Sequence, residues 1–362
     1  MSIQTKTYTS KKSGKTKTKY YAVIRNQATG KLQWSKAFDK RSDAKLEEAR
    51  MISTAKEAAS IPSLSFGEVA ASWVKASDGV YANTTLQGYL WYLKKHLAPV
   101  FNDMLIDEIT TKQIQDFINR LHISYSSETV NKTINLLSNI FNHAKNLGMI
   151  SSSPVEGIRR KKVALKPITT WSPEDIKAFL DYEKTKDSPY YNMFLLQFST
   201  GMRPSEVCGI WKDCLKGDLL ILSRGYDRYN CVSDMKTGKS HRSLRLPEYI
   251  ARRLNALMEA SEGQFLFVNE NGRPVNPNAY SKAFKRILRS YNKEMDASLP
   301  DVSLYEAARH SFGTNMIVDN EIPVSIVSSI MGNSERVLQD RYVHVRNEVQ
   351  TVAISNYVEQ IV

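Results

Sequence analysis

Four stretches between residues 66 and 146 carry apolar residues at spacings of three and four, which is the period of an amphipathic helix. Polar residues separate these stretches, which are residues 66–74, 85–97, 111–121 and 127–146. Each such helix has to bury its apolar face against a neighbour, so a run of four predicts a compact helical unit. We therefore expect an all-α, four-helix domain over residues 64–158.

Residues 1–60 have a different character, with aromatic and β-branched residues placed between charges. Residues 19–25 (KYYAVIR) and 32–38 (LQWSKAF) read as strands on either side of the turn NQATG. A helical pattern follows over residues 42–58, with Ser42 as the expected N-cap, and Pro62 marks a hinge. A chain of 362 residues is longer than one hydrophobic core usually grows, so we expect this segment to be a separate domain.

Residues 165–362 mix helical and strand patterns. A helix is expected after Ser172, because Pro173 suits its first turn and Asp175 takes the capping-box position. Further helical patterns lie at residues 190–200, 247–260 and 277–295. They flank short strand patterns at residues 218–222, 229–235 and 243–247. We expect a mainly helical domain with a small antiparallel sheet, which makes the whole chain an α+β multidomain protein.

The chain is strongly basic, with a formal net charge of +13. Residues 1–50 hold thirteen lysines and arginines against four acidic residues. Such a stripe favours a polyanion, because each neutralised phosphate releases condensed counterions, and the alternative is a solvated tail. The residues that we expect to contact DNA are Lys11, Lys12, Lys15, Lys17 and Lys19 and, in the linker after the helical unit, Arg159, Arg160, Lys161 and Lys162.

Other features of the composition narrow the compartment and the chemistry. No run of about 18 apolar residues occurs, and the first residues lack the apolar stretch of a secretory signal. We therefore expect a cytoplasmic protein without a membrane partner. Cys208, Cys214 and Cys231 show neither metal-ligand spacing nor an even count, and we interpret them as reduced structural thiols. We expect no cofactor and no metal.

Four short motifs in the last domain hold residues that are suited to phosphate chemistry. In STGMRPSEV, Arg203 stands just before a helix that Pro204 is expected to start, where backbone amides also favour anions. The other motifs are KTG with Lys236 in an expected hairpin turn, EAARHSF with Arg309, and GNSERVLQDRYVHV with Tyr342. Each has an ordinary explanation when taken alone: a solubilising lysine, a charged turn or an amphipathic tyrosine.

In this order and spacing, the four motifs resemble those of the tyrosine recombinase, or phage integrase, family. The resemblance covers about residues 165–350 in detail. It implies that residues 165–362, with their C-terminal tail, form the catalytic domain, and that residues 64–158 bind core DNA sites. It also implies that residues 1–60 bind arm-type DNA sites through a three-stranded sheet and a helix. A homotetramer on double-stranded DNA, with helper proteins that bend DNA or set the direction of the reaction, follows from the same resemblance.

The resemblance implies a role for each matched residue in site-specific recombination. Arg203 and Arg309 would hold the two non-bridging oxygens of a scissile DNA phosphate. Tyr342 would attack phosphorus and form a 3′-phosphotyrosyl link, and Lys236 would donate the proton that the leaving oxygen needs. The ester to tyrosine conserves the energy of the broken bond, so a phage or mobile element could be integrated or excised without ATP and without a metal.

Three further residues match positions that support the chemistry in the family. Glu206 is expected to support Arg203 rather than to react. His310 matches a histidine that commonly follows the second arginine, and its alternative role is helix packing or hydrogen bonding behind the reacting groups. His344 also matches the pattern and is expected to orient the segment that carries Tyr342.

Two positions depart from the family pattern. Glu306 stands where a histidine is usual, and Asn333 stands where a histidine or tryptophan is usual. We expect Glu306 to act as the base for Tyr342, with Arg309 neutralising its charge, and Asn333 to donate a hydrogen bond to a phosphate oxygen. The departures leave open a catalytically weakened protein that serves as a DNA-binding regulator or architectural factor. A metal-dependent nuclease, the third hypothesis, would need clustered carboxylates that these motifs lack.

Overall fold

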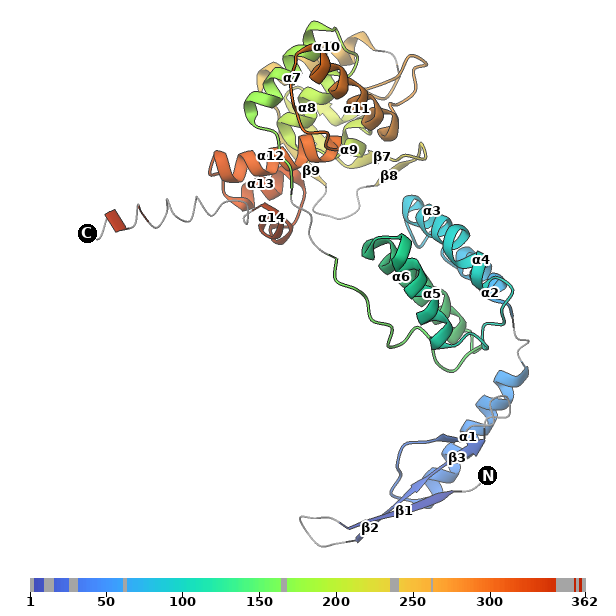
Figure 1. The fold of residues 1–362 in the computed structure, drawn as a ribbon. Coiled ribbons are helices and arrows are strands. Elements are labelled where there is room, and N and C mark those ends of the chain that lie inside the picture. Colours follow the sequence, from blue (N-terminus) through green and yellow to red (C-terminus); the bar gives the residue numbers. More distant parts are fainter. Residues whose placement is uncertain are drawn as a thin grey trace. The chain divides into compact units, whose positions relative to one another are not determined.

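The computed structural model describes residues 3–9, 16–25, 32–60, 64–163, 168–234, 241–261 and 263–342, together with residues 355, 358 and 359. The chain divides into two compact units, Met1–Ala164 and Leu165–Val362 (Figure 1). Most of the described residues are helical, and the strands are short and antiparallel. The expected α+β class is therefore confirmed.

The N-terminal segment has two antiparallel strand pairs, and an isolated bridge between Tyr20 and Phe38 joins the first pair to the residues after the second. Strand β1 (Gln4–Thr9) pairs with β2 (Thr16–Tyr21), and β3 (Val23–Arg25) pairs with β4 (Leu32–Trp34). The expected strand over residues 19–25 is broken at Ala22, because its N–H donates to the side-chain oxygen of Ser35 over 2.9 Å instead of to a strand carbonyl.

Helix α1 (Arg41–Ser60) follows the second hairpin. It begins one residue before Ser42, so the expected N-cap at Ser42 is wrong. The Ser42 hydroxyl donates instead to the carboxylate of Asp43 in the first turn of the helix, over 3.2 Å.

The expected four-helix unit is present within the first compact unit. Its helices are α2 (Phe66–Ala76), α3 (Asn83–Tyr92) continued by η1 (Leu93–Leu97) and α4 (Ala98–Phe101), α5 (Thr111–Ser124) and α6 (Ser127–Asn146). Capping boxes at Ser65 and Thr110 start α2 and α5. The helices enclose one apolar core that includes Phe66, Phe101 and Phe141, as the helical period predicts.

The second unit begins with the helix that the capping box predicts. Ser172 caps α7 (Pro173–Thr185) and accepts from the N–H of Asp175 over 3.1 Å. The main core lies between this helix and its neighbours and contains Trp171, Phe179 and Phe284. The neighbours are α8 (Tyr191–Thr200), α9 (Pro204–Cys208), α10 (Glu248–Ala260) and α11 (Pro277–Glu294).

Two small antiparallel sheets accompany these helices. One has the strand order β5-β6-β9, and the other pairs β7 with β8. The strands are β5 (Leu215–Lys216), β6 (Leu219–Leu222), β7 (Arg224–Tyr226), β8 (Val232–Asp234) and β9 (Arg242–Arg245), and η2 (Lys212–Cys214) precedes them. The described strands on either side of residue 236, β8 and β9, thus pair with other strands and not with each other.

The C-terminal helices of this unit lie together (Figure 1). A second, smaller core is buried among them. One continuous helical segment is built from η4 (Tyr305–His310), α12 (Ser311–Thr314) and η5 (Asn315–Asp319), and α13 (Val324–Met331) and α14 (Glu335–Tyr342) follow it. Phe312, Val327, Met331, Leu338 and Tyr342 are buried together between them.

Two further findings concern the chain as a whole. Within the ranges that the structure describes, no helix combines the length and the apolar character needed to cross a membrane. The three cysteines are free thiols, as expected, and Cys208 and Cys214 are buried. Cys231 is also a free thiol, but it is exposed.

Candidate active site

Arg203 and Arg309 converge on one oxygen atom, the amide Oδ1 of Asn333. Arg203 Nη2 donates to this oxygen over 2.8 Å, and Arg309 Nη2 donates to it over 2.9 Å. Guanidinium groups only donate, so the side of the amide that faces them has to be its oxygen. Residues from the start of α9, from η4 and from the turn after α13 therefore meet at one acceptor oxygen.

The guanidinium group of Arg309 is completely buried. Its Nη1 donates to the carbonyl of Gly201 over 2.6 Å, and its Nη2 also donates to the carbonyl of Met331 over 2.8 Å. Its Nε has no hydrogen-bond partner among the described residues. Burial, and then the nearby charge of Arg203, lower the pKa of Arg309 from its ordinary value. Because the buried charge of Arg309 is costly in free energy, an anion bound beside its guanidinium group would be stabilised.

Glu206 lies one turn after Arg203 and holds it in place. Its carboxylate accepts from Arg203 Nη1 over 2.5 Å and from the backbone N–H of Arg203 over 2.9 Å. A third arginine, Arg242 on β9, binds the same carboxylate over 2.9 Å. Burial opposes the ionisation of Glu206, but Arg242 and then Arg203 outweigh it, so the pKa of Glu206 lies below its ordinary value.

Tyr342 is 2% exposed and lies at the end of α14. Its hydroxyl is 2.7 Å from Nδ1 of His310. Its ring packs onto Gly313, where an added Cβ would lie only 3.0 Å from the Tyr342 Cζ atom. Only glycine leaves room for the ring at this approach. Burial is the main cause that raises the pKa of Tyr342 well above 10.

His310 is the group in contact with the Tyr342 hydroxyl. Burial, and then the charge of Arg341, lower the pKa of His310 to about 4, so its imidazole is neutral near pH 7. A neutral imidazole has one unprotonated nitrogen, and with Nδ1 unprotonated it accepts the hydrogen of Tyr342. His310 therefore holds the position next to the phenol that a base would need.

Glu306, which we expected in that position, faces another way. Its carboxylate accepts from the N–H of Ser303 over 2.8 Å and from the hydroxyl of Ser303 over 2.7 Å. The bonds to Ser303 lower the pKa of Glu306, which weakens it as a base. Among the described residues it makes no hydrogen bond to Tyr342. The structure thus uses Glu306 as a cap for the first turn of η4, because Ser303 stands at the capping distance of three residues.

Some of the expected residues lie outside the described ranges. Lys236 and His344 belong to this group, as do Lys11, Lys12 and Lys15. The expected hairpin around Lys236 lies on residues 235–240, whose flanking strands β8 and β9 belong to different sheets.

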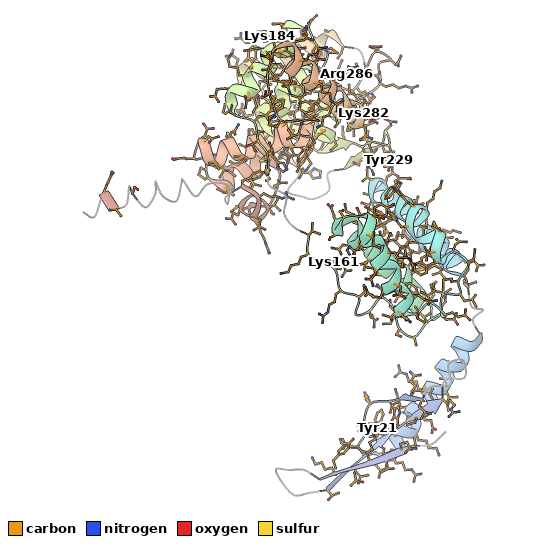
Figure 2. All side chains as sticks on the ribbon, in the orientation of Figure 1. Tyr21, Lys161, Lys184, Tyr229, Lys282 and Arg286 are labelled. Atoms are coloured by element: carbon orange, nitrogen blue, oxygen red, sulfur yellow. The ribbon has the colours of Figure 1, made fainter. Side chains whose placement is uncertain are left out.

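The described basic residues of the first unit lie on its surface. Lys19 is paired with Asp39 over 2.6 Å, so its charge is already balanced, whereas Lys17 stands opposite Tyr8 on the exposed hairpin. Tyr21, which is labelled in Figure 2, is the last residue of β2, the strand that also carries Lys17 and Lys19.

The basic run 159–162 follows α6, where Asn135 accepts two bonds from Arg160, over 3.0 and 2.7 Å. Asn131 donates to the carbonyl of Lys161, a residue labelled in Figure 2, over 2.9 Å. The backbone at Lys161 and the side chain of Arg160 are thus anchored to α6. The side chains of Arg159, Lys161 and Lys162 remain exposed to solvent.

Two residues near the site were not anticipated from the sequence. Arg242 could have been found by the period of β9, because Leu244 and Leu246 are buried and alternate residues share a face of a strand. Arg242 is two residues before Leu244, so its side chain points to the same buried face. Tyr305 packs edge-on against His310, with ring centroids 5.0 Å apart, and no sequence signal distinguished it from an ordinary helix residue.

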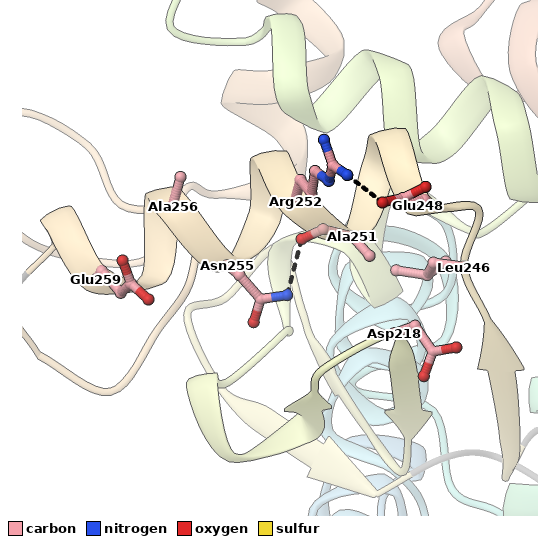
Figure 3. Close-up of a pocket in the computed structure, with 8 residues that line it drawn as sticks. All are labelled: Asp218, Leu246, Glu248, Ala251, Arg252, Asn255, Ala256 and Glu259. Carbon is pink, nitrogen blue, oxygen red and sulfur yellow. Dashed lines mark hydrogen bonds and ion pairs between the residues drawn. The ribbon is translucent and has the colours of Figure 1, made fainter.

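A hollow of about 470 Å³ lies elsewhere on this unit, beside α10 (Figure 3). Asp218, Glu248, Arg252, Asn255 and Glu259 are among its lining residues, which include none of the candidate catalytic residues. Glu248 is paired with Arg252 across its wall. Across the described parts of the chain, no three His, Cys, Asp or Glu side chains are grouped as metal ligands.

Two sequence families match the chain. Residues 170–348 match the phage integrase family, and residues 66–161 match the phage integrase central domain. A tyrosine recombinase XerC-like protein of Caldanaerobacter subterraneus subsp. tengcongensis is 26% identical over 289 residues, which are 69% of this chain and 71% of the relative. The ICEBs1 integrase of Bacillus subtilis is 25% identical over 274 residues, covering 71% of this chain and 73% of that protein.

Solved structures agree with these matches at the level of the fold. The Tn1549 transposon integrase in complex with transposon right end DNA superimposes with a TM-score of 0.68 at 19% identity, over 82% of this chain and all of that chain. A lambda integrase tetramer bound to a Holliday junction gives a TM-score of 0.61 at 16% identity, over 91% of this chain and 95% of that one.

Proposed function

The chain belongs to the phage integrase family of tyrosine recombinases, enzymes that cleave and rejoin DNA, and we propose that its nucleophile is Tyr342. In this proposal Tyr342 forms a 3′-phosphotyrosyl link at specific sites and so integrates or excises a mobile element. The observation that carries the proposal is the convergence of Arg203 and Arg309 on one acceptor oxygen. Tyr342 and its partner His310 belong to the same compact unit.

Asn333 occupies the position that we assign to the scissile phosphate. Its Oδ1 accepts from both arginines, as one non-bridging phosphate oxygen would. An incoming phosphate carries a full charge where the amide carries none, so it competes well for the two guanidinium groups. Once displaced, the amide of Asn333 can turn its NH₂ group towards a phosphate oxygen, which is the donor role expected from the sequence.

The proposed cleavage is a single displacement at phosphorus. The Tyr342 oxygen bonds to phosphorus and releases its proton to Nδ1 of His310 as the bond to the 5′-oxygen breaks. Lys236 supplies the proton that makes this oxygen a 5′-hydroxyl, a role that rests on the family motif. Arg203 and Arg309 stabilise the growing charge on the non-bridging oxygens. The reverse displacement by the 5′-hydroxyl of another strand completes the exchange.

The DNA-free arrangement is a resting state in this proposal. Tyr342 and Arg309 are both buried, so neither can reach a DNA backbone without a local rearrangement. The raised pKa of Tyr342 and the lowered pKa of His310 both oppose transfer of the proton between them. An anion beside His310 favours its protonated form, so DNA binding reduces this barrier. Cleavage of stray phosphodiesters is thereby suppressed until a site is bound.

The proposed division of labour along the chain follows the expected domains. Residues 64–158 bind core sites, with the basic run at residues 159–162 tracking the backbone, and residues 1–60 bind arm-type sites. Two linked modules raise avidity without new contacts at either site. Strand exchange between two duplexes needs four nucleophiles, so we propose a homotetramer on double-stranded DNA, in the bacterial cytoplasm and with helper proteins that bend the DNA.

A nicked suicide substrate tests the proposal directly. Wild-type protein should accumulate a covalent DNA adduct, and Tyr342→Phe should form none while binding the same DNA. Tyr305→Phe is the matched control, because it removes a phenol hydroxyl from a ring that packs against the same histidine. An adduct in the Tyr342→Phe protein would eliminate Tyr342 as the nucleophile. Wild-type protein that binds its site without forming any adduct would instead support the DNA-binding regulator.

A further inference from the structure

Arg242 lies behind the phosphate pocket and belongs to none of the four motifs. We propose that Arg242 is a positioning residue that neutralises Glu206 and so keeps the net charge of the pocket matched to the transition state. The inference rests on the proposed recombinase function, because it concerns the same scissile phosphate.

The contact between Arg242 and Glu206 is a buried, forked ion pair. Nη2 of Arg242 donates to Oε2 of Glu206 over 2.9 Å, and Nη1 lies 3.5 Å from Oε1. The side chains are 6% and 3% exposed, so water screens the pair little. A carboxylate in such a place is costly unless it is fully paired. Arg242 is therefore a necessary partner of the ionised Glu206.

The charge count shows what this pairing does for the phosphate. Glu206 also binds Arg203, and with Arg203 as its only partner it would cancel the charge of one phosphate-binding group. Of the three guanidinium groups, that of Arg309 alone would then supply net positive charge. With Arg242 in place, three guanidinium groups and one carboxylate leave two positive charges in the pocket.

Two positive charges suit the transition state better than the ground state. A phosphodiester carries one negative charge, and the pentacoordinate arrangement at phosphorus carries a second when the tyrosine oxygen adds. Only interactions that are stronger in the transition state than in the ground state accelerate the reaction. A pocket reduced to one positive charge would bind DNA through its many other phosphate contacts but would lose rate in the chemical step.

Arg242 also fixes the turn that carries Asn333. Its Nε donates to the carbonyl of Ile330 over 2.6 Å. Gly332 adopts a left-handed conformation with φ of 64°, and a Cβ there would lie 2.7 Å from Nη1 of Arg242. The guanidinium group therefore sits directly under the turn, and Met331, whose carbonyl binds Arg309, lies between the two contacts.

The test compares Arg242→Met with Arg242→Lys in the full-length protein. The rate of adduct formation is measured with a suicide substrate in single turnover, on a normal scissile phosphate and on a methylphosphonate at the same position. The methylphosphonate lacks one negative charge. Arg245→Met is the matched control, because Arg245 lies on the same strand, is exposed and is paired with Asp218. Thermal midpoints and DNA binding are measured for every variant.

We expect Arg242→Met to slow cleavage of the normal phosphate about 100-fold, the range found when one preorganised charge-stabilising donor is removed. The loss should shrink to about tenfold or less on the methylphosphonate, whose transition state needs less positive charge. Arg242→Lys, which keeps the charge without the fork, should recover most of this difference, and Arg245→Met should match wild type.

Equal losses on both substrates would overturn the proposal and leave Arg242 as a structural ion pair. If Arg242→Met does not fold, Arg242→Gln decides, because it also removes the charge but keeps a hydrogen-bond donor: a larger loss on the normal phosphate supports the proposal, and equal losses on the two substrates contradict it. A wild-type protein that forms no adduct would instead show that the recombinase function itself is wrong, and the inference would fall with it.

Discussion

The two halves of the site differ in how ready they are for DNA. In the arginine half, Arg203, Glu206 and Arg242 already form a connected network of charged groups around an acceptor oxygen. In the tyrosine half, Tyr342 is buried in a small apolar core and bonded to a neutral histidine. In the first half the groups proposed to bind the phosphate already converge on one oxygen, although Arg309 is itself buried, whereas in the second half the nucleophile points into a core. The contrast teaches that the charged partners of the phosphate are arranged before DNA binds, while access to both buried groups depends on a local rearrangement.

After the loss of the nucleophile in Tyr342→Phe, the largest expected effect is that of Arg309→Lys, which tests the arginine half. A lysine cannot bind the carbonyls of Gly201 and Met331 and also reach the phosphate position with a planar fork. We expect the rate of adduct formation to fall about 1,000-fold, at the upper end for loss of one charge-stabilising group. Single-turnover cleavage measures it. A loss below tenfold would show that the pocket does not depend on this fork.

His310→Gln tests the tyrosine half. Glutamine can bind the Tyr342 hydroxyl but cannot take up its proton, so we expect cleavage to slow about 100-fold, as for loss of a general base. Glu306→Gln is the matched control, since its carboxylate bonds to Ser303, and it should stay within about threefold of wild type. The reverse order of losses would return the role of base to Glu306. Both variants should still bind core-site DNA.

Asn333→Asp sharpens the comparison by changing the charge of the placeholder atom. A carboxylate between Arg203 and Arg309 would be displaced by phosphate with more difficulty than the amide, because its bonds to both groups are charge-assisted. We expect a loss of about 30-fold in cleavage rate, the size of one strong charged hydrogen bond. Asn333→Ala, which leaves the position empty, should lose less. Equal losses in the two variants would refute the placeholder role.

The smallest effect is a pH dependence of stability that arises in the tyrosine half. The pKa of His310 is lowered from 6.5 to about 4 in the folded protein, so the unfolded chain binds the proton more readily. The stabilisation from a neutral His310 is present above pH 6.5 and is lost as the pH falls from 6.5 towards 4. Denaturant titrations of wild type and His310→Gln measure it, and the variant should show a shallower loss over this window. Parallel curves would contradict the burial of a neutral imidazole.

The sequence predicted the helices of the fold more completely than it predicted the contacts within the site. Capping residues such as Ser172 and Thr110 and the apolar period of the helices are local signals, and they placed most helices within a few residues. Ser42 failed because a serine inside a first turn has the same local pattern as a cap. The arginines and Tyr342 were recognised from motif order.

The contacts among the site residues could not be predicted, because they depend on where carboxylates and imidazoles turn in three dimensions. Glu306 binds Ser303 three residues away, and the same spacing in the sequence fits both a capping pair and a catalytic carboxylate. The bond between His310 and Tyr342 spans 32 residues and two helices. No local pattern encodes such a distance.

The bonds of Arg309 have a consequence for how this protein can be altered. One side chain links the carbonyl of Gly201, at the end of α8, to that of Met331, at the end of α13. The two turns are remote along the chain, but the side chain of Arg309 couples the positions of their carbonyl groups. Exchange of either turn alone with that of a relative would shift the other carbonyl, so grafts meant to retarget the enzyme have to transplant both together.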